Sequence, residues 1–113
     1  MAVRSSRETV EAVLADMKSA LLQGKFYLVR RDKNIGTLSR LGLTLSDVCD
    51  TLSELAFANY VKGPETDRDY PASDKLWVFK QRVNEQTVYI KFKVEYQTNG
   101  QVKVISFHID ESA

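Results

Sequence analysis

The sequence predicts an α+β domain in which N-terminal helices pack on one face of an antiparallel β-meander. Two observations lead to this prediction. Apolar residues recur at helical spacing in the first half of the chain, and they alternate with a period of two between Leu76 and Ile109. Helices that are followed by a run of strands with short turns are typical of the α+β class.

The first helix is expected at residues 6–23. Ser5 and Glu8 have the spacing of a capping box, in which each side chain satisfies a backbone N–H of the other residue. Gly24 suits the position just after a helix, where the backbone is left-handed. The apolar stripe that would face the core consists of Val10, Val13, Leu14, Met17 and Leu21.

Two shorter helices are expected next. After a strand-like or extended run at residues 26–29, Asp32 is placed to cap a helix that continues to about Arg40. Thr44 and Asp47 form a second capping-box pair and begin a third helix. The buried face of this third helix would contain Leu45, Val48, Leu52 and Leu55.

The segment from Asn59 to Asp74 predicts a loop, because Gly63-Pro64 and Tyr70-Pro71 interrupt a polar stretch. Three strands are then expected at residues 76–83, 87–97 and 101–109. Two-residue turns are predicted at Asn84-Glu85 and at Asn99-Gly100, the second of which is a strong hairpin signal.

These turns predict which residues lie opposite each other. The first turn pairs Trp77 with Phe92, Phe79 with Ile90 and Lys80 with Tyr89. The second pairs Phe92 with Phe107 and Val94 with Ile105 on the core face, and Lys93 with Ser106, Lys91 with His108 and Tyr89 with Asp110 on the opposite face. Lys103 should then lie on the core side of the sheet.

The opposite face is expected to be basic and to carry the one histidine of the chain. It collects Lys80, Arg82, Tyr89, Lys91, Lys93 and His108, with Glu95 and Asp110 as its acids. Neighbouring lysines repel each other, and a bound anion would relieve that cost. Cleavage of RNA without a metal needs a proton acceptor, a proton donor and cations around the phosphate, and a tyrosine can also stack on an unpaired base. The alternative interpretation is an ordinary solvated sheet face.

Composition bounds the remaining possibilities. The chain has 113 residues, one cysteine, and a net charge of +1 from 16 basic and 15 acidic residues, which fits one compact domain over residues 1–113. No apolar run is long enough to span a membrane, no secretory signal follows Arg4, and the single Cys49 suits a reducing cytoplasm. The small net charge is a cancellation between a basic segment at residues 25–40 and an acidic one at residues 44–74.

Other kinds of site are disfavoured. The sequence has no P-loop, no dinucleotide-binding glycine motif, no HExxH, no GxSxG and no EF-hand spacing. Glu65, Asp67, Asp69 and Asp74 form an acidic cluster without the order of ligands of a calcium loop, so a solvated loop is preferred to a metal site. Cys49 is expected to be a buried structural thiol, although a Cys–His nucleophile stays open.

Over residues 18–110 the sequence resembles the motility quorum-sensing regulator (MqsR) toxin family. The resemblance rests on short spaced segments: Leu41-Gly42-Leu43, Val48-Cys49, Asn59-Tyr60-Val61-Lys62, Leu76-Trp77, Val88-Tyr89-Ile90-Lys91 and Ile105-Ser106-Phe107-His108. It implies a RelE-like α+β fold and a small bacterial endoribonuclease that cleaves mRNA without a cofactor or metal. It also implies neutralisation by a cognate antitoxin, with which the toxin can assemble into a higher-order complex.

Carried over by position, the resemblance implies catalytic roles for Lys62, Tyr89 and His108. Lys62 matches the lysine of the family's Tyr-x-Lys segment, and His108 stands where the family often has lysine. Imidazole titrates near neutral pH, which suits acid or base work. One position departs from the family, because Val78 replaces a glutamine after the tryptophan. Lys80, Arg82, Lys91 and Lys93 are then expected to bind RNA.

Two functions from other classes remain open. The same basic face could serve a non-catalytic RNA- or protein-binding regulatory module, for which salt-dependent binding without cleavage products would be the sign. It could also belong to a small, for example phage-encoded, regulatory protein that meets an acidic partner. Neither function needs His108 beside Tyr89, so the ribonuclease interpretation is preferred.

Overall fold

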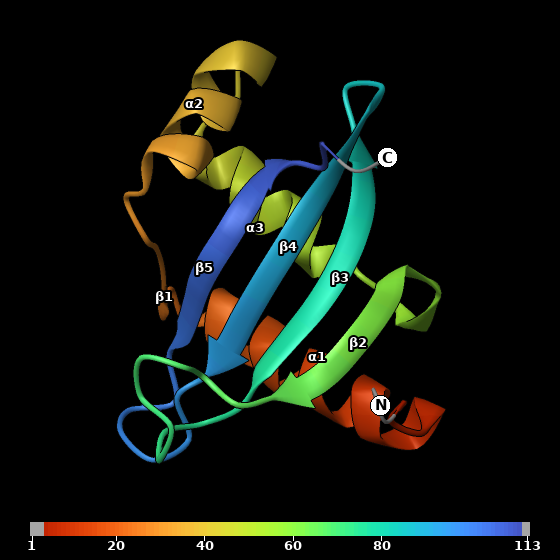
Figure 1. The fold of residues 1–113 in the computed structure, drawn as a ribbon, viewed down its shortest axis with the longest axis vertical. Coiled ribbons are helices and arrows are strands. Elements are labelled where there is room, and N and C mark those ends of the chain that lie inside the picture. Colours follow the sequence, from red (N-terminus) through yellow and green to blue (C-terminus); the bar gives the residue numbers. More distant parts are fainter. Residues whose placement is uncertain (1–3, 112–113) are drawn as a thin grey trace.

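The computed structural model describes residues 4–111 (Figure 1). In this part of the chain the helices are α1 (Arg7–Leu22), α2 (Asp32–Leu41), α3 (Leu45–Ser53) and the 3₁₀ turn η1 (Phe57–Asn59). The strands are β1 (Phe26–Leu28), β2 (Tyr60–Glu65), β3 (Leu76–Val83), β4 (Gln86–Val94) and β5 (Val102–Ile109). They form one sheet in the order β1-β5-β4-β3-β2, and only the β1–β5 pair in this range is parallel. The α+β prediction is confirmed.

The hydrophobic core lies between the sheet and the helices α1 and α3, which cross behind it in Figure 1. The spacing of apolar residues in α1 gives the helix one buried face, as expected. Phe79 and Phe92 are fully buried and stack at 5.4 Å between ring centroids. None of the helices in residues 4–111 has the length and apolarity needed to cross a bilayer.

The helix starts were predicted with mixed success. The capping box of Thr44 and Asp47 is confirmed: Thr44 Oγ1 accepts from the Asp47 N–H, and Asp47 Oδ2 accepts from the Thr44 N–H. The Ser5 cap was wrong, because Ser6 accepts from the Thr9 N–H and Ser5 instead donates to the Gly63 carbonyl. Asp32 is the first residue of α2 rather than its cap.

The β3–β4 hairpin matches its prediction. Asn84 and Glu85 form the turn with φ of 48° and 67°, the left-handed values that a type I′ turn requires. Lys80 lies opposite Tyr89, and Phe79 lies opposite Ile90.

The predicted turn at Asn99-Gly100 is wrong. The β4–β5 connection is a longer loop, closed by hydrogen bonds from the Glu95 N–H to the Gln101 carbonyl and from the Gly100 N–H to the Glu95 carbonyl. Contacts from outside the hairpin hold this loop: Tyr96 donates to Asp16 at 2.6 Å, and Asp74 accepts the Gln97 N–H at 3.2 Å. The turn is therefore decided by its tertiary partners.

This loop changes the register of β5, and a bulge at Ile105 changes it again. Beyond the bulge Tyr89 lies opposite His108, so the observed pairing is displaced by two residues from the expected one. A displacement of two keeps every side chain on its predicted face. Between the loop and the bulge the pairing is displaced by three residues, and an odd displacement moves side chains of β5 to the other face. Lys103 therefore lies on the basic face opposite Lys93, and Ile105 lies outside the core, both contrary to prediction.

The prediction of a loop over residues 59–74 was wrong at its start. Residues 60–65 form β2, which pairs irregularly with β3 and places Lys62 opposite Val78. Gly63 allows this close approach, because its φ is 134° and a Cβ there would lie 3.0 Å from the Leu76 carbonyl oxygen. Irregular pairing and a proline at the sheet edge hide the period-two pattern.

Helix α2 lies along the outer side of β5, past the end of β1 (Figure 1). Two of its buried polar side chains take the place of a neighbouring strand. Asn34 Oδ1 accepts the Phe107 N–H at 2.9 Å, and Thr37 Oγ1 accepts the Ile109 N–H at 3.1 Å. The Asn34 amide also donates to the carbonyls of Val29 and Ile105. The backbone of β5 is thus held on both sides of His108.

Candidate functional site

Tyr89 and His108 form the centre of the candidate site. They face each other across β4 and β5, and their rings stack with centroids 5.3 Å apart and planes inclined by 19°. Lys80 lies opposite Tyr89 on the other side, so Lys80, Tyr89 and His108 form one row across the sheet. We call the face that carries this row the basic face.

The histidine ring has a defined hydrogen-bonding arrangement. Its Nδ1 lies 3.1 Å from the carbonyl oxygen of Ile109. A carbonyl can only accept, so Nδ1 is the nitrogen that donates in this contact. In the neutral ring the lone pair is then on Nε2, which is the atom able to exchange a proton with a ligand.

The row opens into a pocket of about 680 Å³, called here the histidine pocket. Its walls come from β3, β4, β5 and α2. Cations line much of it. The residues that matter for a charged ligand are Arg31, Asp32, Lys33, Arg40, Lys80, Tyr89, Lys91, Ser106, His108, Asp110 and Glu111.

The cations of this pocket differ in how they are neutralised. Lys80 Nζ lies 2.7 Å from Asp110 Oδ2, and the Asp110 side chain is 6% exposed. Lys91 forms no ion pair with any residue in 4–111, and its Nζ lies 6.0 Å from the centre of the Tyr89 ring. Arg31 donates to Ser106 Oγ and to the Ile105 carbonyl. Lys91 and Arg31 therefore keep their charges available for an anion, as do Lys33 and Arg40, which form no ion pair within residues 4–111 either.

Lys62 does not join the central row. It lies one row away, in line with Val78 and Lys91, and its Nζ forms an ion pair with Glu65 at 3.2 Å. Adjacent strands are about 4.8 Å apart and a row step is about 7 Å, which puts the backbones of Lys62 and Tyr89 roughly 12 Å apart. The structure thus brings Tyr89 and His108 together and leaves Lys62 at the margin.

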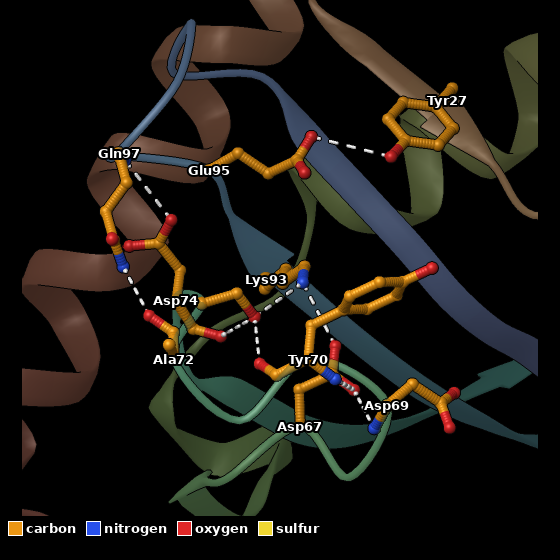
Figure 2. A network of polar contacts seen from close by, with 10 residues as sticks. Tyr27, Asp67, Asp69, Tyr70, Ala72, Asp74, Lys93, Glu95 and Gln97 are labelled. Atoms are coloured by element: carbon orange, nitrogen blue, oxygen red, sulfur yellow. Dashed lines mark hydrogen bonds and ion pairs between the residues drawn. The ribbon is translucent and has the colours of Figure 1, made fainter.

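The two remaining residues that were predicted to bind RNA, Lys93 and Arg82, differ in exposure and in charge compensation. Lys93 is 3% exposed, and its Nζ lies 3.0 Å from Asp67 Oδ2 and 3.1 Å from Ser73 Oγ (Figure 2). Its charge is compensated inside the protein, contrary to the expected unrelieved repulsion. Arg82 is exposed beside the β3–β4 turn and donates to the Glu85 carbonyl.

A second and larger hollow adjoins the histidine pocket. We call it the loop cleft, because its wall is the segment between β2 and β3, and its volume is about 1070 Å³. Arg31 and Lys91 line both hollows. Lys62 and Lys103 line the loop cleft but not the histidine pocket.

Three residues of this surface were missed from the sequence. Arg31 belongs to the Arg30-Arg31 pair just before α2, a basic run that could have been tested as an anion site. Ser106 was placed on the correct face but was given no role, although Arg31 donates to it. Lys103 was assigned to the wrong face, and no local signal reveals the bulge that decides its position.

The acidic cluster is divided among separate contacts. Glu65 pairs with Lys62, Asp67 with Lys93, and Asp74 accepts the Gln97 N–H. Within residues 4–111 no group of three His, Cys, Asp or Glu side chains is arranged to hold a metal ion. Cys49 is partly exposed rather than buried, and it lines an apolar hollow with Phe26 and Leu38 that does not include His108.

Comparison with known proteins assigns the chain to a protein family. The model of the family described as "Motility quorum-sensing regulator, toxin of MqsA" matches residues 9–109. No curated protein is significantly similar to the chain. The matched range includes Tyr89, His108 and every strand of the sheet.

Proposed function

Because the chain belongs to the family of motility quorum-sensing regulator toxins, whose partner is the antitoxin MqsA, it is the toxin of a toxin–antitoxin system, and we propose that it acts as a metal-independent mRNA endoribonuclease. The observation that carries the proposal is the stacked pair of Tyr89 and His108 in a pocket lined with cations. An mRNA substrate would place this activity in the bacterial cytoplasm.

The proposed reaction is transesterification by the RNA itself. One group of the pair removes the proton from a 2′-hydroxyl, and the 2′-oxygen attacks the adjacent phosphorus. The bond from phosphorus to the 5′-oxygen breaks, and the second group supplies a proton to that oxygen. The products are a 2′,3′-cyclic phosphate and a free 5′-hydroxyl, so the reaction consumes no water. Proton transfers of this kind contribute about 10²- to 10⁴-fold in rate each.

The two rings suit these proton transfers for different reasons. His108 Nε2 is the free nitrogen of the ring, since Nδ1 is held by the Ile109 carbonyl. The Tyr89 hydroxyl can both donate and accept. Stacking at 5.3 Å keeps the two groups within reach of a single phosphodiester.

The cations would stabilise the phosphate, which gains charge in the transition state. Lys91 is the strongest candidate, because its Nζ lies 6.0 Å from the centre of the Tyr89 ring and no ion pair within residues 4–111 neutralises it. Lys80 lies in the central row, but it shares its charge with Asp110. Lys62 would act from the margin, and Arg82 from the rim of the basic face. Lys93 is omitted because its buried charge is already paired with Asp67.

The test is incubation of the purified protein with RNA, followed by analysis of the new ends. Wild type is expected to produce 2′,3′-cyclic phosphate and 5′-hydroxyl ends in the presence of a chelator. His108→Ala is expected to lose cleavage and growth arrest while it still binds RNA. As a control, Lys18→Ala changes a lysine on α1 that lines neither the histidine pocket nor the loop cleft, and should cleave like wild type.

Two outcomes would contradict the proposal. Full cleavage by His108→Ala would remove the histidine from the chemistry. Salt-dependent binding of RNA by wild type without any cleavage products would favour the non-catalytic binding module instead.

A further inference from the structure

We propose that the loop cleft is a second binding site for the RNA strand that occupies the histidine pocket. In this subsite an unpaired base stacks on Tyr70, and the phosphate beside it is held by Lys103, Lys91 and Arg31. The inference rests on the proposed ribonuclease function and adds to it a position where the enzyme grips its substrate away from the reacting bond.

The two hollows form one continuous path. Arg31 and Lys91 line both of them, so a strand that leaves the histidine pocket past these cations enters the loop cleft. The cleft is larger than the pocket, at about 1070 against 680 Å³. It therefore has room for nucleotides that the chemistry itself does not require.

Tyr70 is built into the wall of the cleft with its ring in contact with solvent. Tyr70 is 60% exposed, whereas Tyr60, which packs in the core, is 6% exposed. The Nζ atoms of Lys103 and Lys93 lie 5.4 and 5.6 Å from the centre of its ring. Both ammonium groups lie over the ring, and the exposed part of the ring is available to an unpaired base, since bases stack on aromatic side chains in grooves whose cations hold the phosphates.

The charges of the cleft favour a polyanion. Two of its acids are neutralised inside the protein, Glu65 by Lys62 and Asp67 by Lys93. Lys103, Lys91 and Arg31 form no ion pair with residues 4–111, and Arg68 is a further exposed cation. Asp69 is the one lining carboxylate in this range without such a partner. An acidic peptide could bind the same cations, but it would supply no nucleobase to stack on the Tyr70 ring.

The wall of the cleft is held in position before any ligand binds. Asp67 Oδ1 accepts the backbone N–H groups of Asp69 and Tyr70, while its Oδ2 accepts from the buried Lys93 (Figure 2). Ser73 Oγ accepts from Lys93 and donates to the Tyr70 carbonyl. Since the backbone of Tyr70 is fixed on both sides, little ordering remains to be done on binding.

The register gives the distance between the two subsites. Lys93 and Lys103, beside Tyr70, lie opposite each other four residues along β4 from the pair of Tyr89 and His108. Four strand residues span about 14 Å. A stacked single strand advances about 3.4 Å per nucleotide, so the stacked base lies at most about four nucleotides from the cleaved bond.

The experiment uses the full chain and an eight-nucleotide RNA centred on a cleavage site that wild type cuts in a longer RNA. A 2′-deoxy nucleotide at that site removes the attacking hydroxyl, so binding is measured without cleavage. Abasic nucleotides are then introduced one position at a time, and fluorescence anisotropy gives the affinity of each RNA for wild type and for Tyr70→Ala.

In wild type, an abasic nucleotide at one position within four of the cleaved bond is expected to weaken binding about 5- to 150-fold. In Tyr70→Ala the same nucleotide should change the affinity less than about twofold. Tyr70→Phe should restore the wild-type pattern because it keeps the ring. The control is Leu22→Ala, which removes a large side chain that is 90% exposed on α1 and lines neither hollow.

If an abasic nucleotide weakens RNA binding equally in wild type and in Tyr70→Ala, the subsite is contradicted and the ribonuclease function is unaffected. Absence of cleavage of the longer RNA by wild type would instead contradict the proposed function. Lys103→Gln supplies an independent check, since loss of one phosphate contact should reduce the slope of log affinity against log salt by about 0.7. An unchanged slope would remove Lys103 from the subsite.

Discussion

The rings of Tyr89 and His108 lie stacked across β4, the central strand of the sheet, and its neighbour β5, with centroids 5.3 Å apart. The relationship follows from register. Both residues point to the basic face, and the bulge at Ile105 brings them directly opposite each other. Without that bulge the register next to the loop would continue, Tyr89 would lie opposite Phe107, and His108 would point to the core face.

The substitution Tyr89→Phe distinguishes the role of the Tyr89 hydroxyl from the role of its ring. Tyr89→Phe keeps a ring that can stack on His108 and removes the group proposed to transfer a proton. Cleavage of RNA is expected to fall about 10²- to 10⁴-fold, with RNA affinity and the free energy of unfolding little changed. Tyr27→Phe removes a hydroxyl that lines neither the histidine pocket nor the loop cleft, so it is the control and should cleave normally. Wild-type cleavage by Tyr89→Phe would exclude the hydroxyl from the reaction.

Asn34 is expected to matter for stability and also for cleavage. Asn34→Ala removes the acceptor of the Phe107 N–H and the donor to two carbonyls, all in a buried setting. Leaving such groups unpaired should lower the free energy of unfolding by about 1–3 kcal/mol. Because the strand beside His108 loses its support, the cleavage rate at low temperature should fall as well.

The control for Asn34 lies on the same helix. Ser39 is exposed in α2, and Ser39→Ala should change the free energy of unfolding by less than about 0.5 kcal/mol. Chemical denaturation of the three proteins measures both effects. Equal stability of Asn34→Ala and wild type would show that α2 does not support β5 in the manner described.

The pair of Lys93 and Asp67 should make stability depend on pH in the acid range. Burial by itself would raise the pKa of Asp67, but hydrogen bonds from Lys93 and from the Asp69 and Tyr70 backbone outweigh it and hold the pKa below its ordinary value. In the unfolded chain the pKa is about 3.9. Ionised Asp67 therefore stabilises the fold above that pH, and this contribution is lost as the pH falls through the lower, folded-state pKa.

Asp67→Asn tests this dependence. At neutral pH it leaves the Lys93 ammonium buried without its counter-charge, which should cost about 3–5 kcal/mol in the free energy of unfolding. The difference from wild type should narrow below about pH 4, where the unfolded wild-type chain takes up a proton at Asp67, and it should continue to narrow until the folded-state pKa is passed. Asp69→Asn, at an exposed position, should follow wild type throughout. A difference that stays constant from pH 2 to 7 would contradict the ion pair.

Gly63 is expected to tolerate no side chain. In Gly63→Ala the new Cβ would lie 3.0 Å from the Leu76 carbonyl oxygen and 3.1 Å from Trp77 Cα, at a φ of 134°. A loss of about 1–3 kcal/mol in the free energy of unfolding should result. Gly36→Ala is the matched comparison, because this helical position has open space around it, and it should gain up to about 1 kcal/mol. Thermal unfolding of both variants gives the comparison, and equal melting temperatures would refute it.

The parts of the fold that were predicted correctly depend on local chemistry. The Thr44–Asp47 capping box and the Asn84-Glu85 turn each involve residues a few positions apart, and both are confirmed. The basic face was also predicted correctly at Tyr89 and His108, because an error of two residues in register does not change the face. The candidate pair was therefore recognisable, although its direct contact was not.

What the sequence by itself determined was the class of the fold, the first hairpin and the face that carries Tyr89 and His108. The tertiary structure alone decided the register of β5, the pairing of Lys93 with Asp67 and the position of Lys103 beside Tyr70. The physical reason is the distance between partners along the chain. Asn34 supports β5 from α2, Asp16 holds the loop after β4 from α1, and such contacts leave no periodic pattern in the segments that they join.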